Sequence, residues 1–194
     1  TVNIVCPGFV PETAGEHGLA LHVDGARLPM AAAALGCSLG EAAGAPDVDV
    51  VSFGGTKCGA LYAESVVVYR EGLADALAYQ RKQAMQLASK LRFVGAQYVA
   101  LLEDDLWREL ATTANAMASS IGEKLSVMPG VGLAFPVATN AVFARLSPGA
   151  RQALAQHYAF GLWEGGLARF MAAWDTTPAH VDPFVAAVAR AVRA

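Results

Sequence analysis

A lysine, an aspartate and an arginine stand where an α/β sheet carries its ligands. Lys57 follows an apolar β-branched run, residues 48–53, and lies within the glycine-rich string GGTKCG. Asp24 and Arg27 lie in HVDGARL, between a short apolar run and an alanine-rich segment. Because open α/β sheets bind ligands at the carboxyl ends of their strands, we expect the three side chains at one sheet edge. The spacing of a phosphate-binding P-loop is absent.

An amine, a carboxylate and a guanidinium together suit pyridoxal phosphate chemistry. A lysine amine forms a Schiff base with the aldehyde of this cofactor. A carboxylate keeps the pyridine nitrogen protonated, and the ring then accepts electrons. An arginine binds a carboxylate or a phenolate with a fixed fork of donors. The sequence therefore predicts a pyridoxal phosphate site built from Lys57, Asp24 and Arg27.

The elements that must position these residues alternate between strands and helices. A helical, alanine-rich segment at residues 28–35 separates apolar strand-like runs at 2–5, 19–23, 48–53 and 65–69. This alternation favours βαβ units and a mostly parallel sheet. The order is that of the second half of a doubly wound domain.

From residue 73 the pattern changes to an α+β one. Two long helical segments are predicted first, and short strands and a closing helix follow, at residues 73–102, 104–127, 133–137, 141–146, 167–174 and 179–192. We therefore expect part of a large cofactor-binding domain at 1–75, a linking helix at 76–102 and a small C-terminal α+β domain at 103–194.

Composition narrows the class of protein. The 194 residues are 55% hydrophobic and 16% charged, which excludes a disordered chain. The net charge of −3 makes nucleic acid an unexpected partner. Mean hydropathy is +0.38, but no apolar run reaches the ~20 residues that span a bilayer, so no membrane partner is expected. Three cysteines without metal-ligand spacing predict no metal site and favour a reducing cytoplasm.

Long strings of the sequence resemble a known family. HVDGARL, followed by SFGGTKCGALYAESVVVY, RKQAMQLASKLRFVGAQ, TNAVFARL and ARFMAAWDTT, is similar to the low-specificity L-threonine aldolases. These belong to the β-eliminating lyase group of fold-type I pyridoxal phosphate enzymes. The resemblance extends from about residue 19 onward. It implies cleavage of L-threonine, L-allo-threonine and related β-hydroxy-α-amino acids to glycine and an aldehyde by a retro-aldol reaction.

The resemblance also implies a role for each site residue. Lys57 would be the Schiff-base lysine, and Asp24 would pair with the pyridine nitrogen. Arg27 would lie beside the cofactor, near its phenolic oxygen and the substrate carboxylate. Arg169, in LARFMAAW, would bind the substrate α-carboxylate. A homodimer or homotetramer is implied too, with the basic stretch of Lys82 and Lys90 able to reach the neighbouring subunit's site.

The sequence departs from the family pattern at three places. Cys58 stands where the family usually has Asn, and the stretch between residues 5 and 18 is shorter than expected. By the resemblance, about the first half of such an enzyme, with the cofactor-stacking histidine, is missing from this sequence. Thr1 opens directly on a strand-like run, which suggests part of a longer polypeptide. His22, near Asp24, is the histidine here that comes nearest to the expected site.

Two other interpretations stay open from the sequence. Lysine, aspartate and arginine serve several reactions of this cofactor, so another lyase or a racemase of the same fold is one alternative. An inactive fragment or a subunit that serves only assembly is the other.

Overall fold

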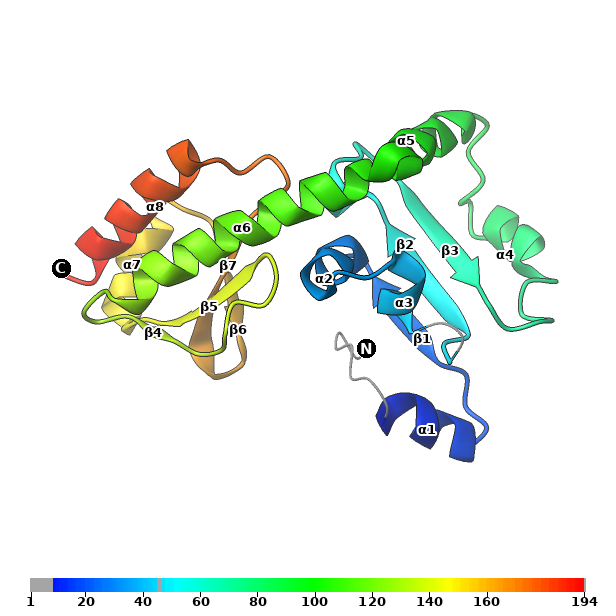
Figure 1. Cartoon of the computed structure of the whole chain (residues 1–194), viewed down its shortest axis with the longest axis horizontal. Coiled ribbons are helices and arrows are strands. Elements are labelled where there is room, and N and C mark those ends of the chain that lie inside the picture. Colours follow the sequence, from blue (N-terminus) through cyan, green and yellow to red (C-terminus); the bar gives the residue numbers. More distant parts are fainter. Residues whose placement is uncertain (1–8, 45–46, 194) are drawn as a thin grey trace. The chain divides into compact units, whose positions relative to one another are not determined.

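The computed structural model describes residues 9–44 and 47–193 (Figure 1). The predicted strand at residues 2–5 lies outside the described residues. The chain divides into two compact units, Thr1–Glu109 and Leu110–Ala194. Among the described residues no helix is long and apolar enough to cross a membrane.

The first unit contains a small sheet with helices before, between and after its strands. Its elements are α1 (Phe9–Glu16), β1 (His22–Gly25), α2 (Leu28–Leu35), α3 (Leu39–Ala43), β2 (Val50–Gly54), the 3-10 turn η1 (Thr56–Cys58), β3 (Glu64–Val68), α4 (Leu77–Gln83), α5 (Arg92–Leu102) and the 3-10 turn η2 (Glu103–Asp105). Helix α2 has the predicted bounds. A proline sits in its first turn, and Gly36 ends it in the left-handed conformation that glycine adopts without strain.

The sheet joins a parallel pair and an antiparallel one. Strand β1 runs parallel to β2, with Asp24 opposite Ser52, and the connection through α2 and α3 makes the predicted βαβ unit. Strand β3 pairs with β2 in the antiparallel sense. The carboxyl ends of β1 and β2 therefore lie at the same edge, where the sequence predicted the site.

The two faces of this sheet differ in burial. Val51 and Phe53 of β2 are buried, and the ring of Tyr98 from α5 lies 5.6 Å from that of Phe53. The alternation of a strand places Asp24 and Ser52 on the opposite face, where Asp24 is exposed.

The predicted linking helix at 76–102 is two helices. Helix α4 ends at Gln83, and α5 begins at Arg92. Met85, in the break, has a φ of 57°, which is left-handed and incompatible with a continuing helix. Apart from Leu77, every residue of α4 is exposed. Helix α4 therefore has no packed face that would keep it in line with α5.

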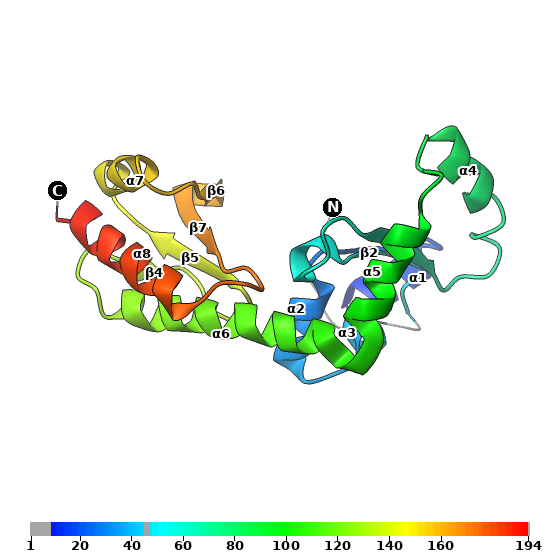
Figure 2. The same cartoon turned by 90° about the horizontal axis from the view of Figure 1, so that it is seen from above.

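The second unit is a four-stranded antiparallel sheet covered by helices on one face (Figure 2). Its elements are α6 (Leu106–Ser126, which begins in the first unit), β4 (Gly132–Leu133), β5 (Ala141–Arg145), α7 (Pro148–Ala155), β6 (Gly161–Trp163), the 3-10 turn η3 (Glu164–Gly166), β7 (Leu167–Met171) and α8 (Pro178–Ala191), with the strand order β4-β5-β7-β6. Val142 and Phe170 point into a core that Ile121 of α6 and Val188 of α8 complete. This unit has the predicted α+β character.

Candidate functional site

Asp24 lies near the carboxyl end of β1, with its side chain exposed. Its Oδ1 accepts a hydrogen bond from the backbone N–H of Ala26 at 3.0 Å, which fixes the turn that leads into α2. Gly25 follows because a Cβ there would lie 2.7 Å from the backbone oxygen of Ser52. This close approach of β1 to β2 sets the position of the carboxylate.

Lys57 is the middle residue of η1, directly after β2, and its side chain is exposed. The turn is closed onto the start of β3. Gly55 N–H donates to the Ala63 oxygen at 2.8 Å, and Ala63 N–H donates to Thr56 Oγ1 at 3.2 Å. The backbone on both sides of Lys57 is thus held while its amine remains free to reach a ligand.

Two further contacts tie this turn to the helices. The Cys58 thiol is buried, and its Sγ donates to the backbone oxygen of Trp107 at 3.3 Å. Burial raises the pKa of this thiol to about 11, so it remains a neutral donor at physiological pH. Gln97 of α5 accepts from the N–H groups of Leu61 and Tyr62 at 2.9 and 3.1 Å and donates to the Tyr62 oxygen at 3.1 Å. The segment that carries Lys57 is therefore anchored from both sides.

A histidine and a serine add to the polar face beside Asp24. His22 Nε2 and Ser52 Oγ are 2.7 Å apart. His22 is two residues before Asp24 on β1, and Ser52 is opposite Asp24 on β2. The three polar side chains therefore occupy one face of the parallel strand pair.

The other predicted residues lie in three places. Arg27, half-buried, occupies the N-cap position of α2, three residues after Asp24. Lys82 is on the exposed helix α4 and Lys90 is exposed near the start of α5. Arg169 belongs to the second unit, on β7. Asp24, Arg27 and Lys57 thus all belong to the first unit, at or after the carboxyl ends of β1 and β2.

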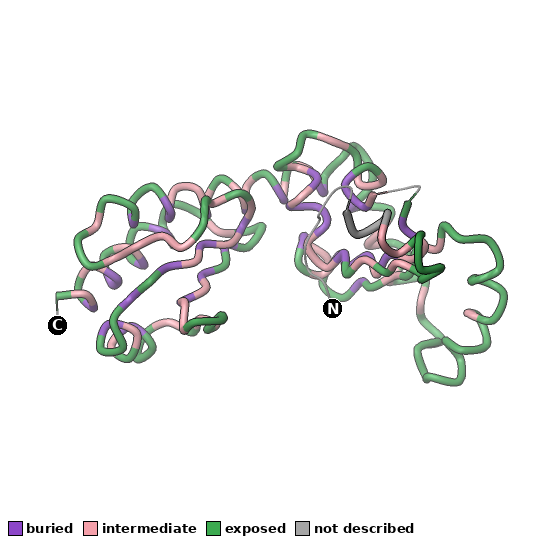
Figure 3. The backbone as a smooth tube through the Cα atoms, turned by 90° about the horizontal axis from the view of Figure 1, so that it is seen from below, coloured by how far each residue is buried: buried purple, intermediate pink, exposed green. Residues whose placement is uncertain are grey.

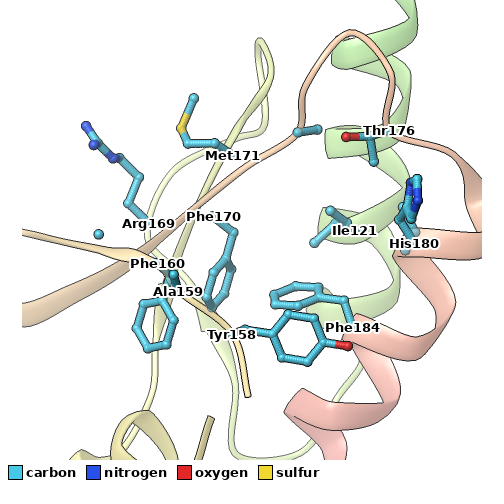
Figure 4. A pocket seen from close by; sticks show the side chains of 13 residues that line it. Ile121, Tyr158, Ala159, Phe160, Arg169, Phe170, Met171, Thr176, His180 and Phe184 are labelled. Carbon is cyan, nitrogen blue, oxygen red and sulfur yellow. The ribbon is translucent and has the colours of Figure 1, made fainter. Parts of the chain in front are cut away.

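Arg169 lies on the sheet face opposite the core of the second unit. Its strand neighbours Ala168 and Phe170 are buried in that core. A cavity of about 380 Å³ lies on the core side, lined by aromatic side chains that include Tyr158 and Phe184. The guanidinium of Arg169 points away from these rings (Figure 4). Of the site residues that the sequence predicted, Arg169 lines this cavity, whereas Asp24, Arg27 and Lys57 do not.

Sequence reasoning missed several residues that support the site. Gln97 and Trp107 act through contacts that span dozens of residues, and no local pattern marks them. Ser52 carried a usable signal, because a polar residue between Val51 and Phe53 in a buried run indicates the open face of a strand. Among the described residues, no cluster of His, Cys, Asp and Glu has the geometry of a metal site.

A family model decides which group of proteins this arrangement belongs to. The model described as "Beta-eliminating lyase" matches residues 9–148. The chain belongs to the beta-eliminating lyase family. The match includes β1, β2 and the turn that carries Lys57, so the predicted family is confirmed on the segment that holds the first-unit site.

Relatives within and beyond this family are similar over most of the chain. The low specificity L-threonine aldolase of Pseudomonas aeruginosa (strain PAO1) is 46% identical over 171 residues, which are 86% of this chain and 49% of that protein. The structure of Leishmania major threonine aldolase has a TM-score of 0.81 at 28% identity and covers 94% of this chain and 55% of that one. The structure of SPT with pyridoxal phosphate has a TM-score of 0.68 at 19% identity, covering 94% and 50%.

These similarities confirm the predicted fold class. The chain is α/β and has the fold of the fold-type I enzymes, with a mixed sheet in the first unit and an antiparallel sheet in the second. The chain spans about half the length of the curated relatives that it matches.

Proposed function

We propose that this chain acts in a pyridoxal phosphate-dependent aldolase that cleaves L-threonine, L-allo-threonine and related β-hydroxy-α-amino acids to glycine and an aldehyde. The observation that carries the proposal is the placement of Asp24 and Lys57 at the carboxyl ends of two neighbouring parallel strands. Family membership and the similarity to low specificity L-threonine aldolases support the reaction, a carbon–carbon lyase cleavage.

The residues present suit the cofactor. Lys57 offers an exposed amine on an anchored turn, and Asp24 offers an exposed carboxylate on the adjoining strand. An amine for the aldehyde and a carboxylate for the ring nitrogen are the two groups that this cofactor requires from a protein. Lys57 and Asp24 would hold it, with Arg27 beside its phenolic oxygen. When bound, the cofactor supplies a sink for the electron pair that is left on Cα.

The chain's own groups then orient the substrate and hold protons. Arg169, together with Arg27, binds the α-carboxylate and so fixes which bond of Cα is held for cleavage. The Cα–Cβ bond breaks as the β-hydroxyl loses its proton, and Cα gains a proton. The products are glycine and an aldehyde, which is acetaldehyde when threonine is the substrate. Asp24 keeps the ring nitrogen protonated throughout.

We also propose a homodimer or homotetramer, working in the cytoplasm. Helix α4 is the observation behind the assembly: Tyr79 is 75% exposed, and Met85 just beyond the helix is 90% exposed. Large apolar side chains at such exposure are typical of a surface that another subunit covers. The division into a large-domain part at 1–75, a connection at 76–102 and a small domain at 103–194 remains part of this proposal.

An absorbance spectrum tests the cofactor and its lysine. Protein mixed with pyridoxal phosphate is expected to develop a visible band that Lys57→Ala lacks. Lys124→Ala, which removes an exposed lysine of α6 in the second unit, should keep the band. Incubation with threonine and phenylserine then tests the reaction. Glycine and the matching aldehyde support it, whereas a keto acid or an inverted substrate would favour another lyase or a racemase.

A further inference from the structure

The guanidinium of Arg169 rests on a surface made by the edge strand β6. Its Cζ lies 5.5 Å from the ring centroid of Trp163, within the range of a cation–π contact. Gly161 pairs directly with Arg169, and Trp163 is the diagonal neighbour two residues further along. The side chains of Arg169 and Trp163 therefore share the face of the sheet that is turned away from the core, with Gly161 beside them.

The guanidinium lies over Gly161 of β6. A Cβ at position 161 would lie 3.4 Å from both Nε and Nη2 of Arg169, which is an ordinary van der Waals distance. The guanidinium therefore covers the position where a side chain of residue 161 would begin. Its Nε is buried and, within the described part of the chain, has no hydrogen-bond partner. The contact with the Trp163 ring, rather than a hydrogen bond at Nε, holds this group where it is.

Other aromatic rings hold Trp163 in turn. Phe143 lies edge-on to Trp163 with 5.7 Å between centroids, and Phe135 lies edge-on to Phe143 with 5.6 Å. Phe143 is also the direct cross-strand partner of Arg169 on β5. Edge-to-face packing of this kind restricts the rotamers of both rings. The ring under Arg169 is therefore fixed before any ligand arrives.

We infer that Trp163 is a positioning residue: it holds the Arg169 guanidinium in the orientation that receives the substrate carboxylate. The inference rests on the proposed function, which gives Arg169 its carboxylate. A guanidinium binds a carboxylate with hydrogen bonds that lie in the guanidinium plane. If that plane is already correctly oriented, less conformational entropy is lost on binding. Trp163 itself touches neither substrate nor cofactor and acts through Arg169.

Kinetics of the cofactor-loaded protein with L-threonine test the inference. Trp163→Leu keeps apolar bulk but removes the π face, and we expect KM to rise about two- to fivefold while kcat changes less. Trp163→Phe keeps a weaker ring and should recover part of the loss. Leu162→Ala is the matched control, because Leu162 is an exposed neighbour on β6 whose side chain faces the other way, and KM should not change. An unchanged KM in Trp163→Leu overturns the inference.

Arg169→Gln separates this inference from the proposed function. It should raise KM by at least about tenfold, and Trp163→Leu should add nothing on that background, because the ring acts through the arginine. A full additional loss on that background contradicts the inference. If Arg169→Gln leaves KM unchanged, the proposed role of Arg169 is wrong, and the failure is that of the proposed function.

A readout that needs no activity tests the contact itself. In nitrogen-15 spectra, the buried Nε–H of Arg169 should exchange slowly with water, and Trp163→Leu should speed this exchange while Leu162→Ala does not. Equal exchange in the wild type and Trp163→Leu overturns the inference even if the protein does not cleave threonine.

Discussion

The two sheets of this chain differ in how far they are buried and in the side chains that they expose. The sheet of the second unit buries one face in a continuous apolar core formed with α6, α7 and α8. The sheet of the first unit exposes a polar row, His22 and Asp24 beside Ser52, next to the turn of Lys57. Most of the exposed large apolar side chains also belong to the first unit. The comparison teaches that the second unit is organised for packing and the first for presenting chemical groups.

Figure 3 shows the same contrast as burial along the chain. In the second unit buried residues recur along the strands and along the facing sides of the helices. In the first unit they gather around β2 and α2, whereas the segment with α4 is exposed almost throughout. We therefore expect the largest stability losses in the core of the second unit and the loss of cofactor chemistry at the polar row of the first.

The largest expected effect comes from the core of the second unit. Phe170 is 4% exposed and contacts the rings of Phe160 and Phe184. Phe170→Ala should lower the free energy of unfolding by about 3–5 kcal/mol, because it leaves a cavity. Val66→Ala, at a 57% exposed position of the first sheet, should change it by less than about 0.5 kcal/mol. Urea unfolding measures both, and equal losses would break the comparison.

Asp24→Asn should affect chemistry without affecting stability. The amide oxygen can still accept the Ala26 N–H bond, but the negative charge is gone. We expect threonine cleavage to slow by at least about 100-fold, while the free energy of unfolding stays within about 0.5 kcal/mol. A variant that loses stability and activity together would show that Asp24 is a structural residue of the first sheet.

Cys58 belongs to both the packed interior and the site, because it is buried and directly follows Lys57. Its folded-state pKa is about 11, against 9.0 for a free thiol, because of burial. Between these two pH values the unfolded chain has lost the proton and the folded chain keeps it, so stability falls as pH rises. The loss should approach about 2 kcal/mol near pH 11.

Urea unfolding from pH 8 to pH 11 measures this loss. Cys58→Ala should lack this part of the pH dependence, whereas Cys37→Ala, at a half-buried position outside the site, should retain it. An identical pH profile in wild type and Cys58→Ala would mean that the thiol does not carry the effect.

The smallest expected effect concerns the anchor of the Lys57 segment. Gln97→Ala removes the bonds from α5 to Leu61 and Tyr62 and should cost about 1 kcal/mol of unfolding free energy. Gln86→Ala removes a single bond to the Ala84 oxygen at an exposed site and should cost close to nothing. Hydrogen exchange at residues 56–62 should rise in the first variant alone. Unchanged exchange there would show that the anchor does not stiffen the turn.

Much of the fold could be read from local patterns. The alanine-rich segment at 28–35 is bounded by a proline and a glycine, and α2 has those same bounds. Strand β6 was missed because three residues, Gly161–Trp163, carry no readable alternation. The predicted strand at 133–137 is only Gly132–Leu133, since Pro136 cannot donate to a sheet ladder.

By itself the sequence determined the chemical groups and the strand ends that carry them. Lys57 and Asp24 could be found because an apolar run, a glycine turn and a charged residue are all neighbours along the chain. The tertiary structure decided what holds these groups. Gln97 and Trp107 on the Lys57 turn, and Trp163 under Arg169, act through contacts between separate elements. Such contacts depend on how side chains meet after folding, and the order of residues along one segment does not contain that information.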